Sequence, residues 1–216
     1  MTFCFYFSVE KAVQVDPENP EAWQTKARLH LIKSEFDEAR TTLNKSLDLW
    51  LPDYLAVLDN RAGAAQKFDP VELCPLHQTT RLSTARMLIE LEEWDKAQSV
   101  LDGVIEEDDE IVDAWYLLGW SNKLRSEQEQ DEMYLGNTRY YLTRAKEVNV
   151  RNPTKDDAMV KHIDELLNDL GPEPEEGNLE ENEDAINLEV QDIFQQLTGT
   201  MDALQDTHFR YKSVKH

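Results

Sequence analysis

The chain has 216 residues, of which 40% are hydrophobic, and its 44 aspartates and glutamates outnumber its 22 lysines and arginines. The formal net charge of −22 disfavours nucleic acid and anionic membranes as partners and favours basic proteins. The two cysteines, Cys4 and Cys74, are far apart in the sequence and match no metal-ligand spacing, so we expect reduced thiols and a cytoplasmic and nuclear location.

Tryptophans and small residues recur with a spacing typical of paired helices. Trp94 lies three residues before Ala97, and Trp115 lies four residues before Gly119. A step of about 34 residues back from Trp115, the period of the tetratricopeptide repeat, leads to Arg81 and places Trp94 and Ala97 in the second helix of that repeat. No long segment alternates β-branched and polar residues, so we predict an all-α chain.

This pattern predicts a tetratricopeptide-repeat superhelix of about three helical hairpins with a capping helix and an acidic C-terminal tail. The array is assigned to residues 1–170, with a half-repeat at 9–19, repeats near 20–53, 78–111 and 112–153, and the capping helix at 156–170. Residues 54–77 are interpreted as an insertion between repeats.

Local features refine this outline in chain order. Residues 1–8 are rich in aromatic side chains but too few for a signal or membrane segment, and we expect them to form a buried turn of helix. Pro52 is expected to end the second helix of the first full repeat, and residues 54–58 to add one further helical turn. The polar stretch 126–131 is longer than a standard turn and is predicted to be a loop.

Residues 171–216 are predicted to form an acidic, partly disordered tail. The segment begins with a linker rich in proline and glycine, and between His162 and Phe209 there are fourteen aspartates and glutamates but no lysine or arginine. Apolar residues nevertheless recur at helical spacing from Ile186 to Leu204. We therefore expect a conditional helix near 184–205 that docks on the array or on a partner.

Catalytic motifs are missing from the sequence. It has no glycine-rich phosphate loop, no nucleophile elbow and no His-Glu-x-x-His motif, and its five histidines are scattered. Paired carboxylates are abundant, but in so acidic a chain they occur by chance. We therefore predict a monomeric binding protein that is no enzyme and has no catalytic, cofactor or metal site.

Stacked helical hairpins present their first helices on a concave face, where partners bind. The groove-facing positions of the predicted repeats give the candidate partner-binding residues Glu21, Arg28, Arg86, Glu90, Asp113, Tyr116 and Trp120. Tyr116 and Trp120 are suited to stacking on an arginine-rich peptide whose charge Asp113 neutralises. The alternative is that Trp120 packs between helices.

A run of five acids precedes the Trp115 helix. It consists of Glu106, Glu107, Asp108, Asp109 and Glu110. One interpretation is structural, because acids at a helix N-terminus are stabilised by the helix dipole. The other is an electrostatic contact for a basic ligand.

Two stretches carry a family resemblance: residues 81–93, and the acidic run followed by the sequence Trp-Tyr-Leu-Leu-Gly-Trp at 115–120. They resemble the dedicated assembly chaperones for large-subunit ribosomal protein four. The resemblance implies capture of a newly made, strongly basic ribosomal protein, which is kept soluble until it enters the large subunit. Because that family usually has more repeats on the N-terminal side, we expect an N-terminally shortened member.

A second interpretation of the same repeats remains open. The chain would then be a scaffold or adaptor subunit that joins a larger complex through apolar repeat surfaces. Binding to a basic client should weaken steeply with ionic strength, whereas an apolar contact should hardly respond.

Overall fold

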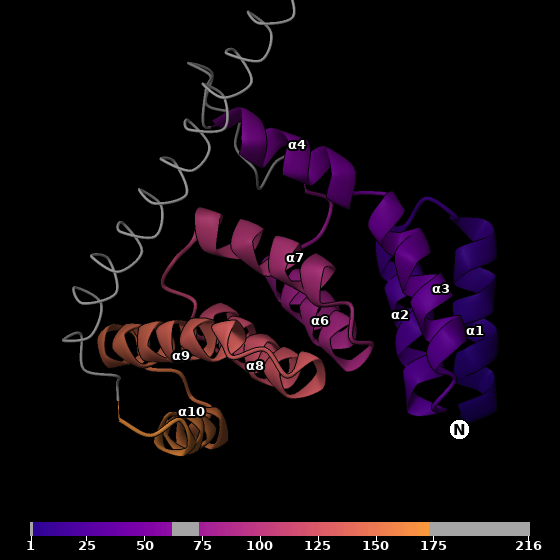
Figure 1. The fold of residues 1–216 in the computed structure, drawn as a ribbon. Coiled ribbons are helices and arrows are strands. Elements are labelled where there is room, and N and C mark those ends of the chain that lie inside the picture. Colours follow the sequence, from indigo (N-terminus) through magenta and orange to yellow (C-terminus); the bar gives the residue numbers. More distant parts are fainter. Residues whose placement is uncertain (1, 62–73, 173–216) are drawn as a thin grey trace, which may run out of the picture. The chain divides into compact units, whose positions relative to one another are not determined.

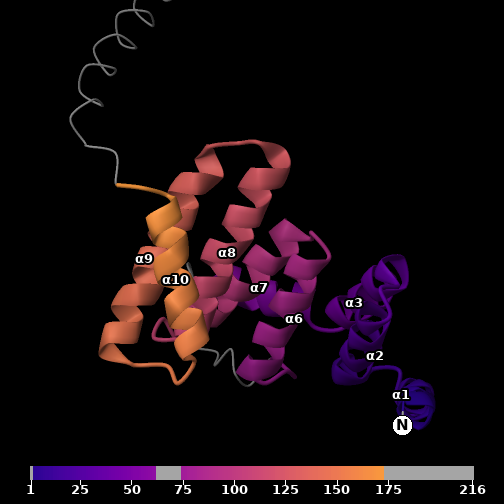
Figure 2. The same ribbon diagram turned by 90° about the horizontal axis from the view of Figure 1, so that it is seen from below.

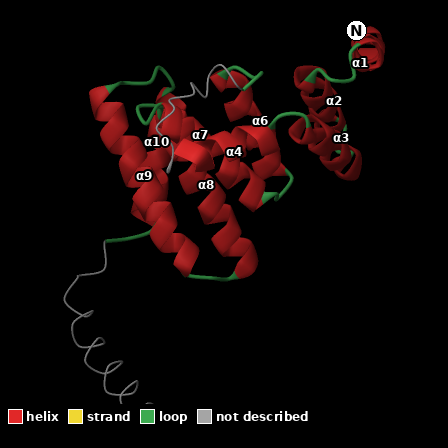
Figure 3. Ribbon diagram, turned by 90° about the horizontal axis from the view of Figure 1, so that it is seen from above, coloured by secondary structure: helices red, strands yellow, loops and turns green. Residues whose placement is uncertain are grey.

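The computed structural model describes residues 2–61 and 74–172, and within these ranges every regular element is a helix (Figures 1 and 3). The predicted all-α class is therefore confirmed. The helices are α1 (Thr2–Val15), α2 (Pro20–Ile32), α3 (Phe36–Asp48), α4 (Leu51–Arg61), α6 (Gln78–Glu90), α7 (Trp94–Glu107), α8 (Val112–Glu129), α9 (Met133–Arg151) and α10 (Asp157–Asp169). The predicted tail, with its conditional helix near 184–205, lies outside the described residues.

Three helical hairpins follow one another along the chain. Helices α2 and α3, α6 and α7, and α8 and α9 pack against each other as neighbours in sequence. The first residues of α6 and α8, Gln78 and Val112, are 34 residues apart, which is the period predicted from the tryptophans. Each hairpin turns at a residue with positive φ, namely Ser34, Glu92 and Gln130, because a left-handed residue ends a helix and reverses the chain.

Small residues lie where the paired helices approach most closely. Ala27, Ala39, Ala85, Ala97, Ala114 and Ala145 have no exposed surface. Gly119 of α8 faces Leu142 of α9 so closely that an added Cβ atom would lie 2.7 Å from the leucine Cγ. The separation of α8 and α9 thus requires a glycine at position 119.

Helix α4 occupies part of the predicted insertion. The sequence predicted one helical turn at 54–58, but the helix extends over Leu51–Arg61, and Pro52 lies in its first turn rather than ending α3. Proline is tolerated there because first-turn N–H groups have no partner within the helix. Trp50 and Tyr54 are almost completely buried, and Tyr54 packs on Gly103 of α7, which holds α4 against the second hairpin.

The third hairpin has longer helices than its sequence pattern predicted. Residues 126–129, assigned to a loop, continue α8, so that prediction is wrong for most of the stretch. Ion pairs one helical turn apart stabilise the extension: Lys123 with Glu127 and Arg125 with Glu129, both at 2.9 Å. Arg125 also contacts Asp95 of α7 at 2.7 Å, which ties the extension to the preceding hairpin.

Helix α10 packs on α9 (Figure 2). Asp156 caps its N-terminus by accepting a hydrogen bond from the Met159 N–H at 3.0 Å. Its buried side chains are Met159, Ile163 and Leu166, and Arg139 of α9 donates to the carbonyl of Leu170 at 2.8 Å. The C-terminal end of α10 is therefore tied to α9 of the third hairpin.

Helix α1 packs on α2 at the other end of the described chain. Val9 and Val13 are buried, and Lys26 of α2 forms an ion pair with Glu10 at 2.7 Å. Phe7 is 67% exposed, so the predicted burial of the first residues is wrong at this position. In the part of the chain that the structure describes, no helix combines the length and the apolar character needed to cross a membrane.

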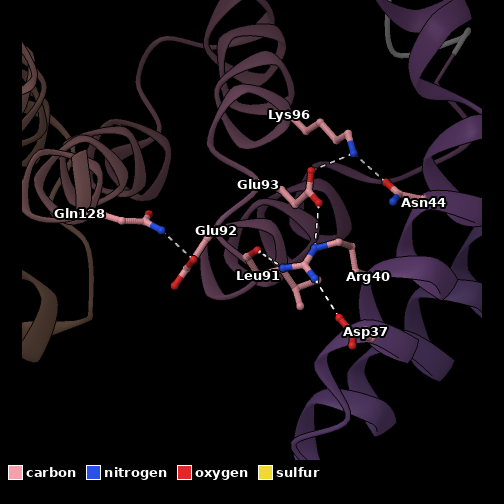
Figure 4. A network of polar contacts seen from close by, with 8 residues as sticks. All are labelled: Asp37, Arg40, Asn44, Leu91, Glu92, Glu93, Lys96 and Gln128. Atoms are coloured by element: carbon pink, nitrogen blue, oxygen red, sulfur yellow. Dashed lines mark hydrogen bonds and ion pairs between the residues drawn. The ribbon is translucent and has the colours of Figure 1, made fainter.

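Polar contacts hold the first hairpin against the second (Figure 4). Arg40 of α3 donates to the Leu91 carbonyl at 2.9 Å and forms an ion pair with Glu93 at 2.9 Å. Lys96 of α7 joins Glu93 at 2.8 Å and Asn44 at 2.9 Å. Because Leu91 and Glu93 lie in the turn between α6 and α7, these contacts fix how the two hairpins stack.

The contact at Gly119 predicts an overpacking defect. Substitution Gly119→Ala should lower the free energy of unfolding by about 1–3 kcal/mol, because the new methyl group collides with the buried Leu142 side chain. The matched control is Gly136→Ala in α9, where an added Cβ meets nothing within 4 Å. This control should be neutral or stabilise by up to about 1 kcal/mol. Urea unfolding of both variants measures the difference, and equal effects would contradict the prediction.

Candidate partner-binding groove

Two hollows lie between the first helices of successive hairpins. The hollow between α2 and α6 has a volume of about 310 Å³ and is lined by residues that include Glu21, Gln24, Arg28, Thr80, Ser83 and Met87. The hollow between α6 and α8 has a volume of about 360 Å³ and is lined by residues that include Arg86, Ile89, Glu90, Tyr116, Trp120 and Leu124. We call them the polar hollow and the aromatic hollow.

The structure brings most of the predicted groove residues to these hollows. Glu21 and Arg28 line the polar hollow, whereas Arg86, Glu90, Tyr116 and Trp120 line the aromatic hollow. Asp113 is next to them through an ion pair with Arg86. Helix α6 contributes to both hollows, since Ser83 and Met87 face one and Arg86 and Glu90 the other.

The aromatic hollow is built on the contact between α8 and α10. The Tyr116 hydroxyl is hydrogen-bonded to Nδ1 of His162 at 2.8 Å, and the Trp120 ring meets the His162 ring edge-on with centroids 4.9 Å apart. Tyr116 and Trp120 are partly buried and pack on the core. The packing of Trp120 between helices is therefore observed, and its predicted stacking on an arginine-rich peptide stays a prediction.

The charges of the aromatic hollow differ from the prediction. Asp113 was expected to neutralise a guest arginine, but it pairs with Arg86 of the preceding hairpin. The side chains of Arg86 and Asp113 are 50% and 34% exposed, so this ion pair is at the surface. Glu90 is exposed in the same hollow, and among the described residues its carboxylate has no ion-pair partner. Glu90 is thus an exposed acid of this hollow without an ion-pair partner among the described residues.

Within the acidic run, Glu107 differs from the other four acids because its side chain is buried. Glu107 is the last residue of α7, and its side chain is only 6% exposed. It accepts hydrogen bonds from Arg81 Nη1 and from the Tyr54 hydroxyl, each at 2.7 Å. Burial raises the pKa of the Tyr54 hydroxyl well above its usual range, so the phenol stays protonated and donates to Glu107. Glu107 is therefore a structural acid, and neither interpretation of the run holds for it.

The other four acids are exposed. Glu106 lies in the last turn of α7, and Asp108, Asp109 and Glu110 form the link to α8. Asp108 accepts a hydrogen bond from the Glu110 N–H at 3.0 Å, and the Asp109 carbonyl accepts one from the Trp115 indole at 2.8 Å. Glu106 is at a helix C-terminus, where the dipole disfavours an acid. The carboxylates of this link remain accessible to a basic partner.

Two residues in or beside the hollows are not among the seven candidate partner-binding residues. His162 was counted among the scattered histidines, although its place one residue before the apolar Ile163 put it beside the buried face of the capping helix. Gln24 is 5% exposed and lines the polar hollow, and its Nε2 has no hydrogen-bond partner among the described residues. Gln24 lies three residues after the candidate Glu21, on the same side of α2, but helix periodicity gave no sign that its amide would be buried.

These features define an α-helical hairpin array in which the first helices of successive hairpins line two hollows. Among the described residues, no group of His, Cys, Asp and Glu side chains has an arrangement that could hold a metal ion. Cys74 is a buried free thiol. The two hollows offer aromatic faces, single charges and hydrogen-bonding groups.

Sequence comparison gives the resemblance a firmer basis. The chain is 31% identical over 183 residues to a Schizosaccharomyces pombe protein named probable assembly chaperone of rpl4, a match over 81% of this chain and 50% of that protein. It is 33% identical over 119 residues to an Emericella nidulans protein of the same name, over 55% of this chain and 27% of that protein. The resemblance predicted from residues 81–93 and 106–120 is confirmed. The chain spans about half the length, or less, of these relatives.

No protein-family model matches the chain. A solved structure of YrrB, described as a TPR protein with an unusual peptide-binding site, aligns with a TM-score of 0.33 and 19% identity over 73% of this chain and 80% of that one.

The contrast within the acidic run predicts different effects for neighbouring acids. Substitution Glu107→Gln should cost about 3–5 kcal/mol of unfolding free energy, because it leaves the buried Arg81 guanidinium without its counter-charge. The matched control, Glu106→Gln, changes the exposed neighbour and should stay within about 0.5 kcal/mol of the parent. Denaturant unfolding with both variants checks this, and a small effect at Glu107 would exclude its structural role.

Proposed function

We propose that this chain is a binding protein that acts as a dedicated chaperone for rpl4 during assembly of the large ribosomal subunit. The observation that carries the proposal is the aromatic hollow, in which the exposed Glu90 carboxylate lies with Tyr116 and Trp120. The relatives named as probable assembly chaperones of rpl4, which match 81% and 55% of the chain, support the choice of client.

The hollow suits a basic side chain for two physical reasons. Aromatic faces attract cations through the ring quadrupole, and the aliphatic stem of arginine or lysine packs on the same rings. The Glu90 carboxylate supplies an opposite charge in the same hollow. The Arg86–Asp113 ion pair joins α6 to α8 at this site and holds the two lining helices together.

The net charge of the chain would speed association with the client and would add little to the contacts within the groove. A charge of −22 attracts a strongly basic protein over a distance of about a Debye length, and speeds association. The seven predicted groove residues include three acids, Glu21, Glu90 and Asp113, and two arginines, Arg28 and Arg86. The net charge of the groove is therefore small. We infer that the exposed acids between α7 and α8, and those beyond residue 172, supply most of the attraction.

The proposal places the protein in the cytoplasm and nucleus. It acts as a monomer, without cofactor and without catalysis, because its task is to cover a basic surface until transfer. Nucleic acid and membranes are not partners in this proposal, since both repel a protein of this charge.

Glu90 provides the direct test of the hollow. Substitution Glu90→Gln should weaken binding of purified rpl4 about two- to fivefold, the range expected for one exposed ion pair. The control Glu38→Gln removes the same charge from an exposed position on α3, away from both hollows, and should leave affinity unchanged. Fluorescence anisotropy at fixed ionic strength gives both dissociation constants. Equal affinities of the two variants would show that Glu90 does not contribute to binding.

A scaffold or adaptor role is the second candidate. It is favoured by the apolar side chains of Phe7, Val15 and Ile32 on α1 and α2, which are 67%, 76% and 70% exposed.

Ionic strength separates the two functions. For a chaperone of a basic client, the dissociation constant for rpl4 should rise steeply from low to high salt, because screening removes the attraction of the acidic chain. A partner held by Phe7, Val15 and Ile32 should bind with nearly constant affinity. Titrations across a salt series measure the slope, and a flat slope for rpl4 would contradict the proposed function.

A further inference from the structure

His162 connects the capping helix α10 to the two aromatic side chains of the aromatic hollow. The hollow lies between α6 and α8, whereas His162 reaches its rings from α10. Nδ1 of His162 is hydrogen-bonded to the Tyr116 hydroxyl at 2.8 Å. The His162 ring meets the rings of Tyr116 and Trp120 edge-on, with centroids 5.8 and 4.9 Å apart. One imidazole is therefore in contact with both aromatic rings of the hollow.

The hydrogen bond to Tyr116 is possible in both charge states of His162. A hydroxyl can donate and accept, so a neutral imidazole accepts from Tyr116 through Nδ1, and an imidazolium donates to it. Burial raises the pKa of the Tyr116 phenol above its usual range, so this hydroxyl stays protonated near neutral pH. Protonation of His162 thus changes the charge beside the hollow, while the contact between α8 and α10 is kept.

The charged groups on the helices around His162 are already engaged with one another. Their ion pairs are Lys161–Glu165 within α10, Lys146–Asp164 between α9 and α10, and Arg86–Asp113 between α6 and α8. Asp156 caps α10 by accepting the Met159 N–H, and Glu90 lies on α6 in the lining of the hollow. Among the described residues, no carboxylate forms an ion pair with His162. A proton on His162 therefore adds a positive charge without a counter-charge next to Tyr116 and Trp120.

We infer that His162 is a positioning residue of the aromatic hollow and that its protonation lowers the affinity of the hollow for a basic side chain. The neutral ring holds Tyr116 and Trp120 in place. The imidazolium is a cation beside the same rings, so it repels a guest arginine or lysine and competes with it for the Trp120 ring. The inference rests on the proposed function, because it takes the guest of this hollow to be cationic.

The direction and size of the effect follow from the charges. Histidine is the side chain that changes its charge between about pH 5 and 8, so mild acidification acts on this site. Affinity for a cationic guest is highest at the alkaline end of this range and falls as the pH is lowered. Two like charges about 10 Å apart near a protein surface repel each other enough to change the affinity about two- to tenfold.

The first test compares the parent with His162→Asn, which keeps an acceptor for the Tyr116 hydroxyl but takes up no proton. Fluorescence anisotropy gives the dissociation constants of a short arginine-rich peptide and of rpl4 between about pH 5.5 and 7.5. On acidification the parent should lose about two- to tenfold more affinity than His162→Asn. The same pH dependence in both proteins, including an equal loss of affinity at every pH in the variant, would show a purely structural role and overturn the inference.

The matched control is His77→Asn. His77 is an exposed histidine at the N-cap of α6 and lines neither hollow. Asparagine is a good N-cap residue, so this variant loses a titratable ring and keeps the helix end. It should show the pH dependence of the parent. A loss of pH dependence as large as that of His162→Asn would assign the effect to the overall charge of the chain and overturn the inference.

The second test uses the parent protein and needs no variant. If a bound cation opposes protonation of His162, linkage requires that binding of the arginine-rich peptide releases protons. Isothermal titration calorimetry at about pH 6.5, in two buffers with different ionisation enthalpies, counts the protons released. We expect a fraction of a proton for each bound peptide. No release, or an uptake of protons, would overturn the inference.

The outcomes separate this inference from the proposed function. If rpl4 does not bind, but the arginine-rich peptide binds with a pH dependence that requires His162, the client is wrong and the role of His162 stands. If rpl4 binds the parent and His162→Asn with the same pH dependence, His162 has no such role and the chaperone function stands.

Discussion

Close approach of paired helices is the constraint on which the rest of this structure depends. Alanines without exposed surface lie at the crossings, and Gly119 leaves no room for a Cβ atom beside Leu142. Because the second helix of each hairpin packs tightly behind the first, α2, α6 and α8 become neighbours along one side of the array. The two hollows exist because these first helices meet each other through longer side chains than those at the crossings within a hairpin.

A large part of the chain's polar chemistry serves this stacking. Arg40 and Lys96 join the first hairpin to the second, and Arg81 holds Glu107 where α4, α6 and α7 meet. The Tyr54 hydroxyl also donates to Glu107 of the buried Arg81–Glu107 pair, which offsets part of the cost of removing two charges from water. The Nε of Arg81 has no hydrogen-bond partner among the described residues. The net charge of −22 therefore overstates the number of acids that a partner can reach.

The groove combines weak, different contacts instead of one strong charge. Its acids are nearly balanced by arginines, and its aromatic rings are already supported by His162 from α10. Under the proposed function, a basic segment would be held through its aliphatic stems on the ring faces, while long-range attraction would come from acids outside the groove. Release of such a client would then require no single buried ion pair to be broken.

The sequence by itself determined the helical class, the period of 34 residues and the face of each helix that lines the groove, because helical periodicity and small residues are local signals. Tertiary structure decided which charges are free. Glu107 pairs with Arg81 and Asp113 with Arg86, partners 26 and 27 residues away, and His162 reaches Tyr116 from 46 residues away. Periodicity gives the direction of a side chain but not the neighbour that it meets. Only the folded chain therefore shows that Gln24 Nε2 and the Glu90 carboxylate have no partner among the described residues.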